Sequence, residues 1–346
     1  MKRRFYVNLF RPIIIGIHGV TLTESEKIWL PELRVYGVIL FSRNVESPSQ
    51  LRQLCDSIRD FLGHDVVIMI DQEGGRVQRL KDPHWPRLPS ALQIGKLWRR
   101  HQFKGLEAAN SLGQVIGSQL AEVGITHVAA PVLDLLIDGA DPIIGDRSFG
   151  TTPAEVIPLA TAFIDGLHRC GITAIVKHIP GMGRVDRDSH DSLPVISTPI
   201  SALKESDWVP FRLVTGTHWA MTAHVVIPEW DKKPITQSEE GIRRIREMFG
   251  DRMIVSDCLT MGAIEGSIEE RVRETLDAGV NLALFSNGSD NDRRRAVSAS
   301  GEPRVTREYP LTLRHLPTMI LQQLLEKLAK VDSDQRLPDP TWDLPN

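Results

Sequence analysis

Cysteine is scarce in this chain of 346 residues, which has only Cys55, Cys170 and Cys258. An odd number of cysteines without metal-ligand spacing favours neither a disulfide framework nor a zinc site. This usage is typical of a reducing compartment, and we expect a cytoplasmic protein.

Long apolar runs and a strong net charge are also missing. No segment approaches the ~20 apolar residues of a membrane span, and the run from Pro12 to Ile17 is too short for the core of a signal peptide. The formal net charge of -3 argues against a protein built to bind nucleic-acid phosphates. We therefore expect no membrane or nucleic-acid partner, and a monomer that binds a small neutral or acidic molecule.

Three common catalytic and nucleotide-binding motifs are absent as well. The sequence contains no Gly-x-Ser-x-Gly elbow, no P-loop and no dinucleotide fingerprint. The "GMG" of Gly181 to Gly183 is too weak a pattern to predict a phosphate site.

Eight short runs rich in Val, Ile and Ala alternate with longer amphipathic stretches, a pattern that predicts β-α units and a parallel sheet. The runs begin at Pro12, Tyr36, Asp65, Thr126, Thr173, Trp219, Arg252 and Val280, and read "PIIIGI", "YGVILF", "DVVIMI", "THVAAP", "TAIVKH", "WAMTAH", "RMIVSD" and "VNLALF". Eight such units predict an α/β protein with a single (β/α)8 TIM-type barrel. A doubly wound open sheet is the alternative fold.

The predicted helices include "SPSQLRQLCDSIRDFL", "EAANSLGQVIGSQLAEVG" and "TPAEVIPLATAFIDGLHRCG", and the last two end in a glycine suited to a C-cap. No linker divides the chain before about residue 287, so we expect one domain over residues 1–330 and a C-terminal tail over 331–346. The segment "NGSDNDRRRAVSASGEPRVTREYP" reads as an irregular or mobile loop.

Charged or titratable residues follow four of the eight predicted strands, where active sites of this barrel lie. These residues are Asp71, the pair Lys177 and His178, His224, and Asp257. Each also has a structural interpretation: Asp257 as a helix N-cap, His224 as a hydrogen-bonded structural histidine, and Glu73 with Arg76 as a pair across a solvated turn. Their convergence on one rim nevertheless favours a functional site.

Asp188 and His190 lie on a predicted loop, because Pro180 and the neighbouring glycines exclude a helix there. An aspartate beside a histidine fixes the tautomer of the imidazole and raises its basicity, which suits an acid/base pair. An ordinary polar loop, or a metal site that includes His178, are the alternatives. The Ile179–Pro180 bond is a candidate for the cis form.

Five blocks in this order resemble the single-domain bacterial β-N-acetylglucosaminidases of glycoside hydrolase family 3, the enzymes of cell-wall recycling. They read "DQEGGRVQRL", "DPIIGDRSFG", "KHIPGMGRVDRDSH", "MTAHVVIP" and "IVSDCLTMGAI". The resemblance extends from about Ile13 to Asn287 and implies a barrel and a retaining double displacement. The implied substrates are muropeptide fragments with a terminal N-acetylglucosamine.

The resemblance also implies a role for individual residues. Asp257 matches the nucleophile, His190 the general acid/base, and Asp188 its partner. An imidazole can donate and then accept a proton near neutral pH without a large pKa shift. The residues expected to bind the sugar hydroxyls are Asp71, Arg79, Arg147, Lys177 and His178. No cofactor and no metal are implied, and the partner is a small carbohydrate.

Three positions depart from the family pattern: Met182 replaces the usual histidine, Cys258 a second aspartate after the nucleophile, and Asn281 an aspartate at the last strand. None of these removes an implied catalytic group. Four alternatives stay open: a family 3 β-glycosidase with another sugar preference, a phosphorylase, a catalytically silent sugar-binding protein, and a metal-dependent hydrolase.

Overall fold

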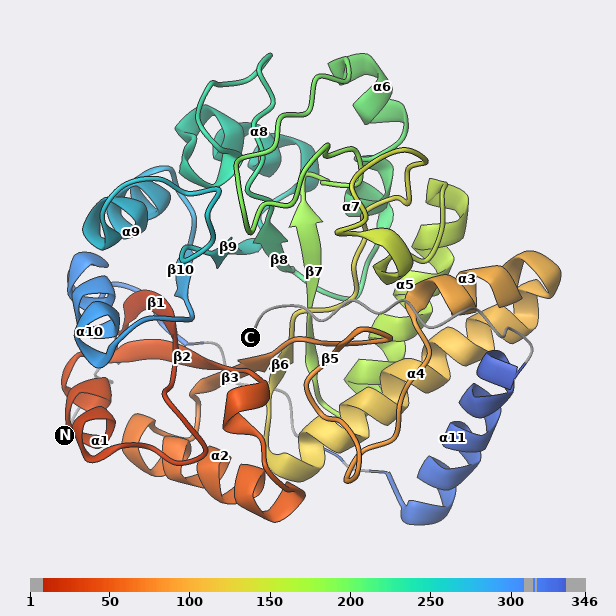
Figure 1. Cartoon of the computed structure of the whole chain (residues 1–346), viewed down its shortest axis with the longest axis horizontal. Helices are drawn as coiled ribbons and strands as arrows, with labels where there is room; N and C mark the ends of the chain where they lie inside the picture. The colour runs from red at the N-terminus through yellow and green to blue at the C-terminus, as the bar shows by residue number, and fades with distance from the viewer. Residues whose placement is uncertain (1–8, 308–313, 315, 334–346) are drawn as a thin grey trace, which may run out of the picture.

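Within the residues that the structure describes, eight parallel strands form one closed barrel (Figure 1). The computed structural model describes residues 9–307, 314 and 316–333. In barrel order the strands are β1 (Arg11–Gly16), β2 (Val35–Leu40), β3 (Val67–Ile70), β6 (His127–Val128), β7 (Thr173–Ile179), β8 (Trp219–Thr222), β9 (Met253–Cys258) and β10 (Leu282–Phe285). Each lies within a predicted run or extends one residue beyond it at one end, so the barrel prediction is confirmed and the open sheet is excluded.

Helices surround the barrel and follow its strands along the chain (Figure 1). They are α1 (Glu24–Glu32), α2 (Pro48–Leu62), α3 (Ala91–Arg100), α4 (Gln102–Val123), α5 (Pro153–Arg169), α6 (Ile200–Glu205), α7 (Val209–Leu213), α8 (Glu239–Phe249), α9 (Ile268–Asp277), α10 (Asp290–Ala299) and α11 (Thr318–Ser333). The three quoted helix predictions correspond to α2, α4 and α5. Among the described residues, no helix is both long and apolar enough to cross a bilayer.

Two apolar clusters lie on opposite sides of the barrel wall, because successive strand residues point to opposite faces of a sheet. Ile14 and Trp219 belong to the cluster inside the barrel. Their chain neighbours Ile13 and Ala220 belong to the larger cluster that packs against the helices. Both clusters are buried, so the barrel interior is a packed core, and a ligand site has to lie at one end of it.

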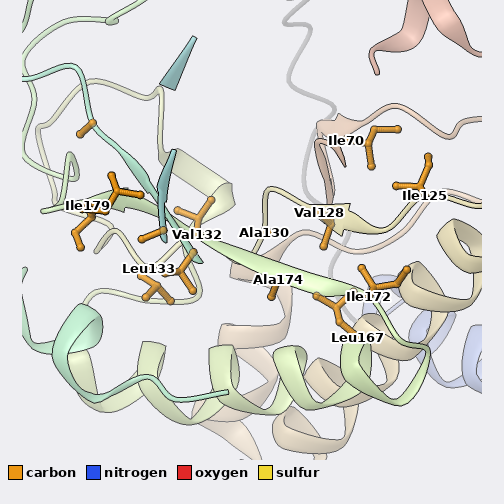
Figure 2. Close-up of a cluster of buried hydrophobic side chains, with 14 of the residues drawn as sticks. Ile70, Ile125, Val128, Ala130, Val132, Leu133, Leu167, Ile172, Ala174 and Ile179 are labelled. Atoms are coloured by element: carbon orange, nitrogen blue, oxygen red, sulfur yellow. The ribbon is translucent and has the colours of Figure 1, made fainter. Parts of the chain in front are cut away.

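Figure 2 shows part of the outer cluster, where Ala174 of β7 lies near Leu167 of α5, and Val128 of β6 and Ile70 of β3 lie farther from that helix. Behind β7, α4 and α5 approach each other closely: a Cβ built on Gly113 would lie 2.1 Å from the carbonyl oxygen of Phe163. Helix α4 ends at a left-handed C-cap, Gly124, as predicted.

The prediction of an irregular loop after residue 287 is wrong for Asp290–Ala299, which form helix α10. Ser289 and Asp292 form a capping box that begins helix α10, and Ala296 and Val297 are fully buried. The sequence pattern does not predict this helix, because its short apolar face follows the charged run "DNDRRR". The last residues of that segment, 308–310, and most of the predicted tail lie outside the described residues.

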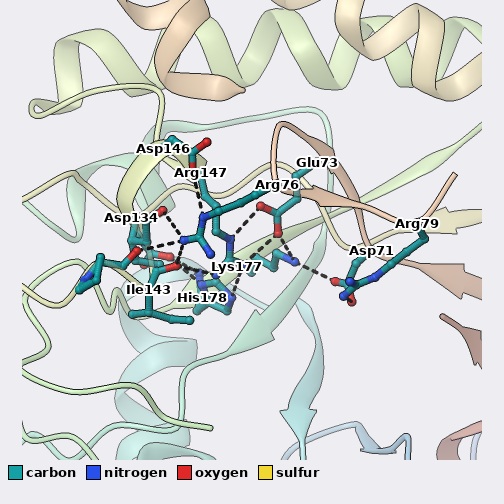
Figure 3. Close-up of polar contacts among 12 residues, drawn as sticks. Asp71, Glu73, Arg76, Arg79, Asp134, Ile143, Asp146, Arg147, Lys177 and His178 are labelled. Atoms are coloured by element: carbon teal, nitrogen blue, oxygen red, sulfur yellow. Dashed lines mark hydrogen bonds and ion pairs between the residues drawn. The ribbon is translucent and has the colours of Figure 1, made fainter. Parts of the chain in front are cut away.

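A short antiparallel hairpin of β4 (Gln72–Gly74) and β5 (Val77–Gln78) directly follows β3. It is too short for the sequence pattern to reveal. The hairpin matters because it places Glu73 and Arg79 beside the ends of the barrel strands (Figure 3).

A buried arginine of α10 forms an ion pair with α1 and a hydrogen bond with the last residue of β1. Arg293 Nη1 donates to Glu26 Oε1 at 2.8 Å and to the carbonyl oxygen of Gly16 at 3.3 Å. The two side chains are 3% and 0% exposed. Because β1 and β10 close the barrel, this contact braces the closure.

We predict that Glu26→Gln lowers the free energy of unfolding by about 3 kcal/mol, because it removes the buried carboxylate that pairs with Arg293 at 2.8 Å and leaves only Asp290, at 3.8 Å, to offset this buried charge. Urea denaturation followed by circular dichroism measures this loss. The matched control is Glu24→Gln, whose side chain is 87% exposed and should change stability by less than about 0.5 kcal/mol. Equal losses in the two variants would contradict the prediction.

Candidate active site

The structure brings the polar residues at the strand ends together on one rim of the barrel. Asp71 directly follows β3, Lys177 and His178 lie in β7, and Asp257 lies in β9. Because parallel strands all end on the same side, these residues face a common region. Arg147, in the 3-10 turn Gly145–Arg147, reaches the same region from the segment after β6 (Figure 3).

Lys177 connects the two carboxylates of this rim. The Lys177 side chain is 3% exposed, and its ammonium group donates to Asp71 Oδ1 at 2.9 Å and lies 2.6 Å from Glu73 Oε1. Arg147 binds both oxygens of Glu73, through Nε and Nη2, each at 2.9 Å. Arg79 Nη2 donates to Asp71 Oδ2 at 3.2 Å. These five residues, Asp71, Glu73, Arg79, Arg147 and Lys177, form one charged network (Figure 3). We call it the sugar-rim network after the role that the family resemblance implies for four of its members.

Mutual attraction keeps the sugar-rim network ionised despite its burial. Burial favours a raised pKa for Asp71, but the charges of Lys177 and Arg79 outweigh it and hold the pKa well below its usual range. Burial acts the same way on Glu73, and Arg147 and Lys177 lower its pKa to about 2. Burial alone would lower the pKa of Lys177, yet Asp71 and Glu73 raise it. At neutral pH the rim therefore presents charged donors beside charged acceptors.

His178 is held in one orientation by Asp134. One oxygen of that carboxylate, Oδ2, lies 2.6 Å from His178 Nδ1 and also accepts from the His178 main-chain N–H at 3.1 Å. The other accepts from the main-chain N–H of Met182 at 2.8 Å. With Nδ1 occupied, Nε2 faces Arg147 Nη2 at 3.4 Å. The carboxylate thus fixes the ring nitrogen that His178 presents to the rim.

Two neighbouring peptide bonds at the end of β7 are cis. Ile179–Pro180 has the cis form that the sequence suggests, and Lys177–His178 is a cis bond that does not precede proline. Both lie where the chain leaves the barrel next to the sugar-rim network.

Asp257 makes one main-chain and one side-chain hydrogen bond, and the side-chain bond uses only Oδ1 of its carboxylate. Its N–H donates to Thr222 Oγ1 at 3.2 Å, and its Oδ1 accepts from the N–H of Cys258 at 2.7 Å. Burial would raise the pKa of Asp257, but the imidazoles of His224 and His178 lower it overall. The group is therefore an ionised carboxylate at neutral pH.

His224 makes hydrogen bonds through both ring nitrogens. Nδ1 lies 2.8 Å from Thr236 Oγ1, and Nε2 lies 3.1 Å from the carbonyl oxygen of Cys258. Thr236 Oγ1 in turn contacts Thr222 Oγ1 at 2.8 Å, and burial lowers the pKa of His224. The structural interpretation of His224 agrees with these contacts, which support the main chain around Asp257.

Asp188 and His190 are in contact, as predicted. Asp188 Oδ1 accepts from the main-chain N–H of His190 at 2.8 Å and lies 2.7 Å from His190 Nδ1. The imidazole side chain is 59% exposed, so its Nε2 is open to solvent or to a substrate. A protonated His190 also contributes to the lowered pKa of Asp257, as its weakest cause.

Two members of the site, Glu73 and Asp134, were missed by the sequence prediction. The suggested pairing of Glu73 with Arg76 is wrong, because Arg76 Nε donates to Asp146 Oδ1 at 2.9 Å. The sequence does contain a signal for Asp134, which is a single carboxylate inside the apolar run "VLDLL". A carboxylate buried in such a run needs hydrogen-bond partners, because its burial without them is costly.

The three departures are accommodated by local contacts. Met182 is 2% exposed within the apolar core. Cys258 Sγ contacts Ser286 Oγ at 2.7 Å and Thr260 Oγ1 at 3.0 Å. Asn281 Oδ1 accepts from Ile254 N at 2.9 Å and Arg246 Nη2 at 2.7 Å, the two bonds that a carboxylate would accept.

The histidines proposed for a metal site have separate partners. His178 binds Asp134 and His190 binds Asp188. In the part of the chain that the structure describes, no group of three or more His, Cys, Asp or Glu side chains is arranged to hold a metal ion.

The sequence of residues 14–302 matches the Glycosyl hydrolase family 3 N terminal domain. The chain belongs to this family. It is 39% identical over 282 residues to a protein of Thiobacillus denitrificans named "Beta-hexosaminidase", covering 80% of this chain and 78% of that one. A second protein of that name, from Nitrosomonas eutropha, is 38% identical over 286 residues and covers 81% of this chain and 82% of its own. The chain is thus a glycoside hydrolase.

Solved structures of the family share the fold. NagZ from Neisseria gonorrhoeae, in complex with N-trifluoroacetyl-D-glucosamine, has a TM-score of 0.82 at 32% identity and covers 94% of this chain and 99% of its own. A family 3 β-N-acetylglucosaminidase from Paenibacillus has a TM-score of 0.78 at 28% identity, covering 93% of this chain and 61% of its own.

We predict that Glu73→Gln destabilises the fold by about 3 kcal/mol at pH 7, because Lys177 and Arg147 lose a shared counter-ion. The carboxylate of Glu73 stabilises the fold above its ordinary pKa of 4.5, and this contribution disappears as the pH falls toward about 2. The stability gap between wild type and variant should therefore close between these pH values.

Urea denaturation at a series of pH values measures this gap. Glu32→Gln, on an exposed residue, is the matched control and should show no gap at any pH. A Glu73→Gln gap that stays constant from pH 7 to pH 2 would rule out the ionised network.

Proposed function

We propose that the chain is a retaining exo-β-N-acetylglucosaminidase that removes terminal non-reducing N-acetylglucosamine from muropeptide and peptidoglycan fragments. The observation that carries this proposal is the placement of the Asp188–His190 pair on a loop that contacts the segment following Asp257. The names of the relatives and the N-trifluoroacetyl-D-glucosamine bound by NagZ support the choice of sugar.

The first step needs a nucleophile and a proton donor. In the proposed reaction a carboxylate oxygen of Asp257 attacks the anomeric carbon while His190, protonated, donates the Nε2 proton to the departing oxygen. Asp188 holds Nδ1 and stabilises the positive charge of the imidazolium. The products are a glycosyl-enzyme ester and the released aglycone.

The second step reverses the role of the imidazole. His190, now neutral, accepts a proton from water at Nε2, and the resulting nucleophile cleaves the ester to Asp257. The two displacements at the same carbon give net retention of configuration.

The sugar-rim network is the proposed binding surface for the sugar hydroxyls. Asp71 supplies an acceptor, and Arg79, Arg147 and Lys177 supply donors. His178, which lies beside the network, contributes its Nε2. Charge-assisted hydrogen bonds of this kind are stronger than neutral ones and fix the orientation of the ring before attack.

We further infer that one domain, spanning residues 1–330, carries the reaction as a monomer in the cytoplasm. The packing of α11 against α3 and α4, with Leu316 N donating to Ser118 Oγ at 2.8 Å, supports a single unit. The three free cysteines agree with a reducing compartment.

We predict that Asp257→Ala lowers turnover of an aryl N-acetyl-β-glucosaminide by about 10⁴-fold or more, because it removes the carboxylate that forms the ester. The matched control, Cys258→Ser, changes the adjacent side chain and should retain most of the activity. Steady-state release of the aryl alcohol measures both. Near-normal turnover by Asp257→Ala would show that Asp257 is not the nucleophile.

A panel of aryl β-glycosides tests the sugar preference and the acceptor. We expect kcat/KM to be highest for the 2-acetamido sugar, since the Paenibacillus relative is named a β-N-acetylglucosaminidase and NagZ binds N-trifluoroacetyl-D-glucosamine. Added phosphate or chelation should leave kcat/KM unchanged. Equal rates on the glucoside would favour a general β-glycosidase. Formation of sugar 1-phosphate would indicate a phosphorylase, and loss of activity on chelation a metal-dependent hydrolase.

A further inference from the structure

The loop that carries Asp188 and His190 rests on the turn that follows the nucleophile strand. Gly262 N–H donates to the carbonyl oxygen of His190 at 2.8 Å, and Ala263 N–H donates to that of Ser189 at 3.1 Å. Ser189 is 1% exposed, whereas the imidazole beside it is largely exposed. The main chain of the dyad is therefore seated on this turn while its catalytic side chain remains open.

The turn itself is tied firmly to β9. Met261 N–H donates to the carbonyl oxygen of Cys258 at 3.1 Å, and the flanking Leu259 and Ile264 are fully buried. The turn begins directly after Asp257, so it moves with the nucleophile. The hydrogen bonds between this turn and the acid/base loop therefore set the distance between the loop and Asp257.

Gly262 leaves no space for a side chain at this contact. A Cβ built on it would lie 2.6 Å from the carbonyl oxygen of His190 and 2.7 Å from that of Asp191. Real Cβ atoms do not approach main-chain oxygens so closely, so one of the two segments would have to move. Gly262 is not among the glycines with positive φ, so the close approach of the loop, and not the backbone conformation, requires glycine here.

We propose that Gly262 is a positioning residue that sets the distance between the acid/base loop and the nucleophile. This inference rests on the proposed function, in which His190 protonates the leaving group and Asp257 attacks. A methyl group at residue 262 lifts His190 away from the glycosidic oxygen but leaves Asp257 and the sugar-rim network in place.

The chemical signature of this defect is a dependence on the leaving group. An activated phenolate leaves with little help from an acid, whereas a poorly activated alcohol needs the proton that His190 supplies. General acid catalysis typically contributes about 10² to 10⁴-fold. Gly262→Ala should therefore lose up to about 10²-fold in kcat/KM on poorly activated aglycones and less than about 10-fold on a dinitrophenyl glycoside.

The test measures kcat/KM for a series of aryl N-acetyl-β-glucosaminides with leaving groups of increasing pKa, in wild type, Gly262→Ala, His190→Ala and the double variant. We expect both single variants to show a steeper dependence on leaving-group pKa than wild type. We also expect the double variant to resemble His190→Ala, because residues that act through one proton transfer are not additive.

Two glycine variants control for nonspecific effects. A Cβ on Gly19, at the same end of the barrel, meets no atom within 4 Å, so Gly19→Ala should match wild type. A Cβ on Gly95, in α3, would lie 1.7 Å from the carbonyl oxygen of Phe149. Gly95→Ala should therefore lower stability, and any loss of activity should be equal for all leaving groups.

Ser189→Gly provides a second test that adds no atom. It keeps the hydrogen bond from Ala263 N–H to the carbonyl oxygen of residue 189 but gives the loop main chain more conformational freedom at the contact. The same leaving-group pattern should therefore appear at smaller magnitude, even if Gly262→Ala fails to fold. A loss that is uniform across leaving groups in these variants, or additive with His190→Ala, would overturn the positioning role of Gly262. If His190→Ala itself shows no leaving-group dependence, the acid/base assignment fails, and this inference fails with it.

Discussion

The parallel hydrogen bonding that closes the strands into one barrel is the constraint on which the site depends. Since all the strands run in one direction, the residues at their carboxyl ends meet on one rim. Asp71, Lys177 and Asp257 are far apart along the chain, and barrel closure brings them to this rim. The Glu26–Arg293 pair braces the closure where the first and last strands meet.

Charge compensation is the second constraint, because an unpaired charge on this buried rim would be costly. Lys177 and Arg147 share Glu73, and Lys177 and Arg79 share Asp71. The network thus keeps donors and acceptors ionised and oriented before any sugar arrives, so less reorganisation is needed on binding. The acid/base pair differs: Asp188 and His190 lie on a loop whose main chain accepts two hydrogen bonds from the turn after β9, while the imidazole of His190 stays largely exposed.

Much of the fold and part of the site could be predicted from local sequence. The barrel strands are apolar runs of suitable length, and the Asp188–His190 contact joins residues only two apart. The helix α10 escaped prediction because its buried face consists of a few residues among charges. Glu73 and Asp134 escaped because their partners, Arg147 and His178, are distant in the chain and meet them only in the folded barrel.

By itself the sequence determined the strand and helix succession, the family, and the residue types at the strand ends, because these depend on local pattern. Only the tertiary structure decided which charges neutralise each other and which imidazole is held by which carboxylate. It also decided that Gly262 contacts the acid/base loop. Those outcomes depend on distances of a few ångströms between remote segments, and such distances are set by how the barrel closes and packs.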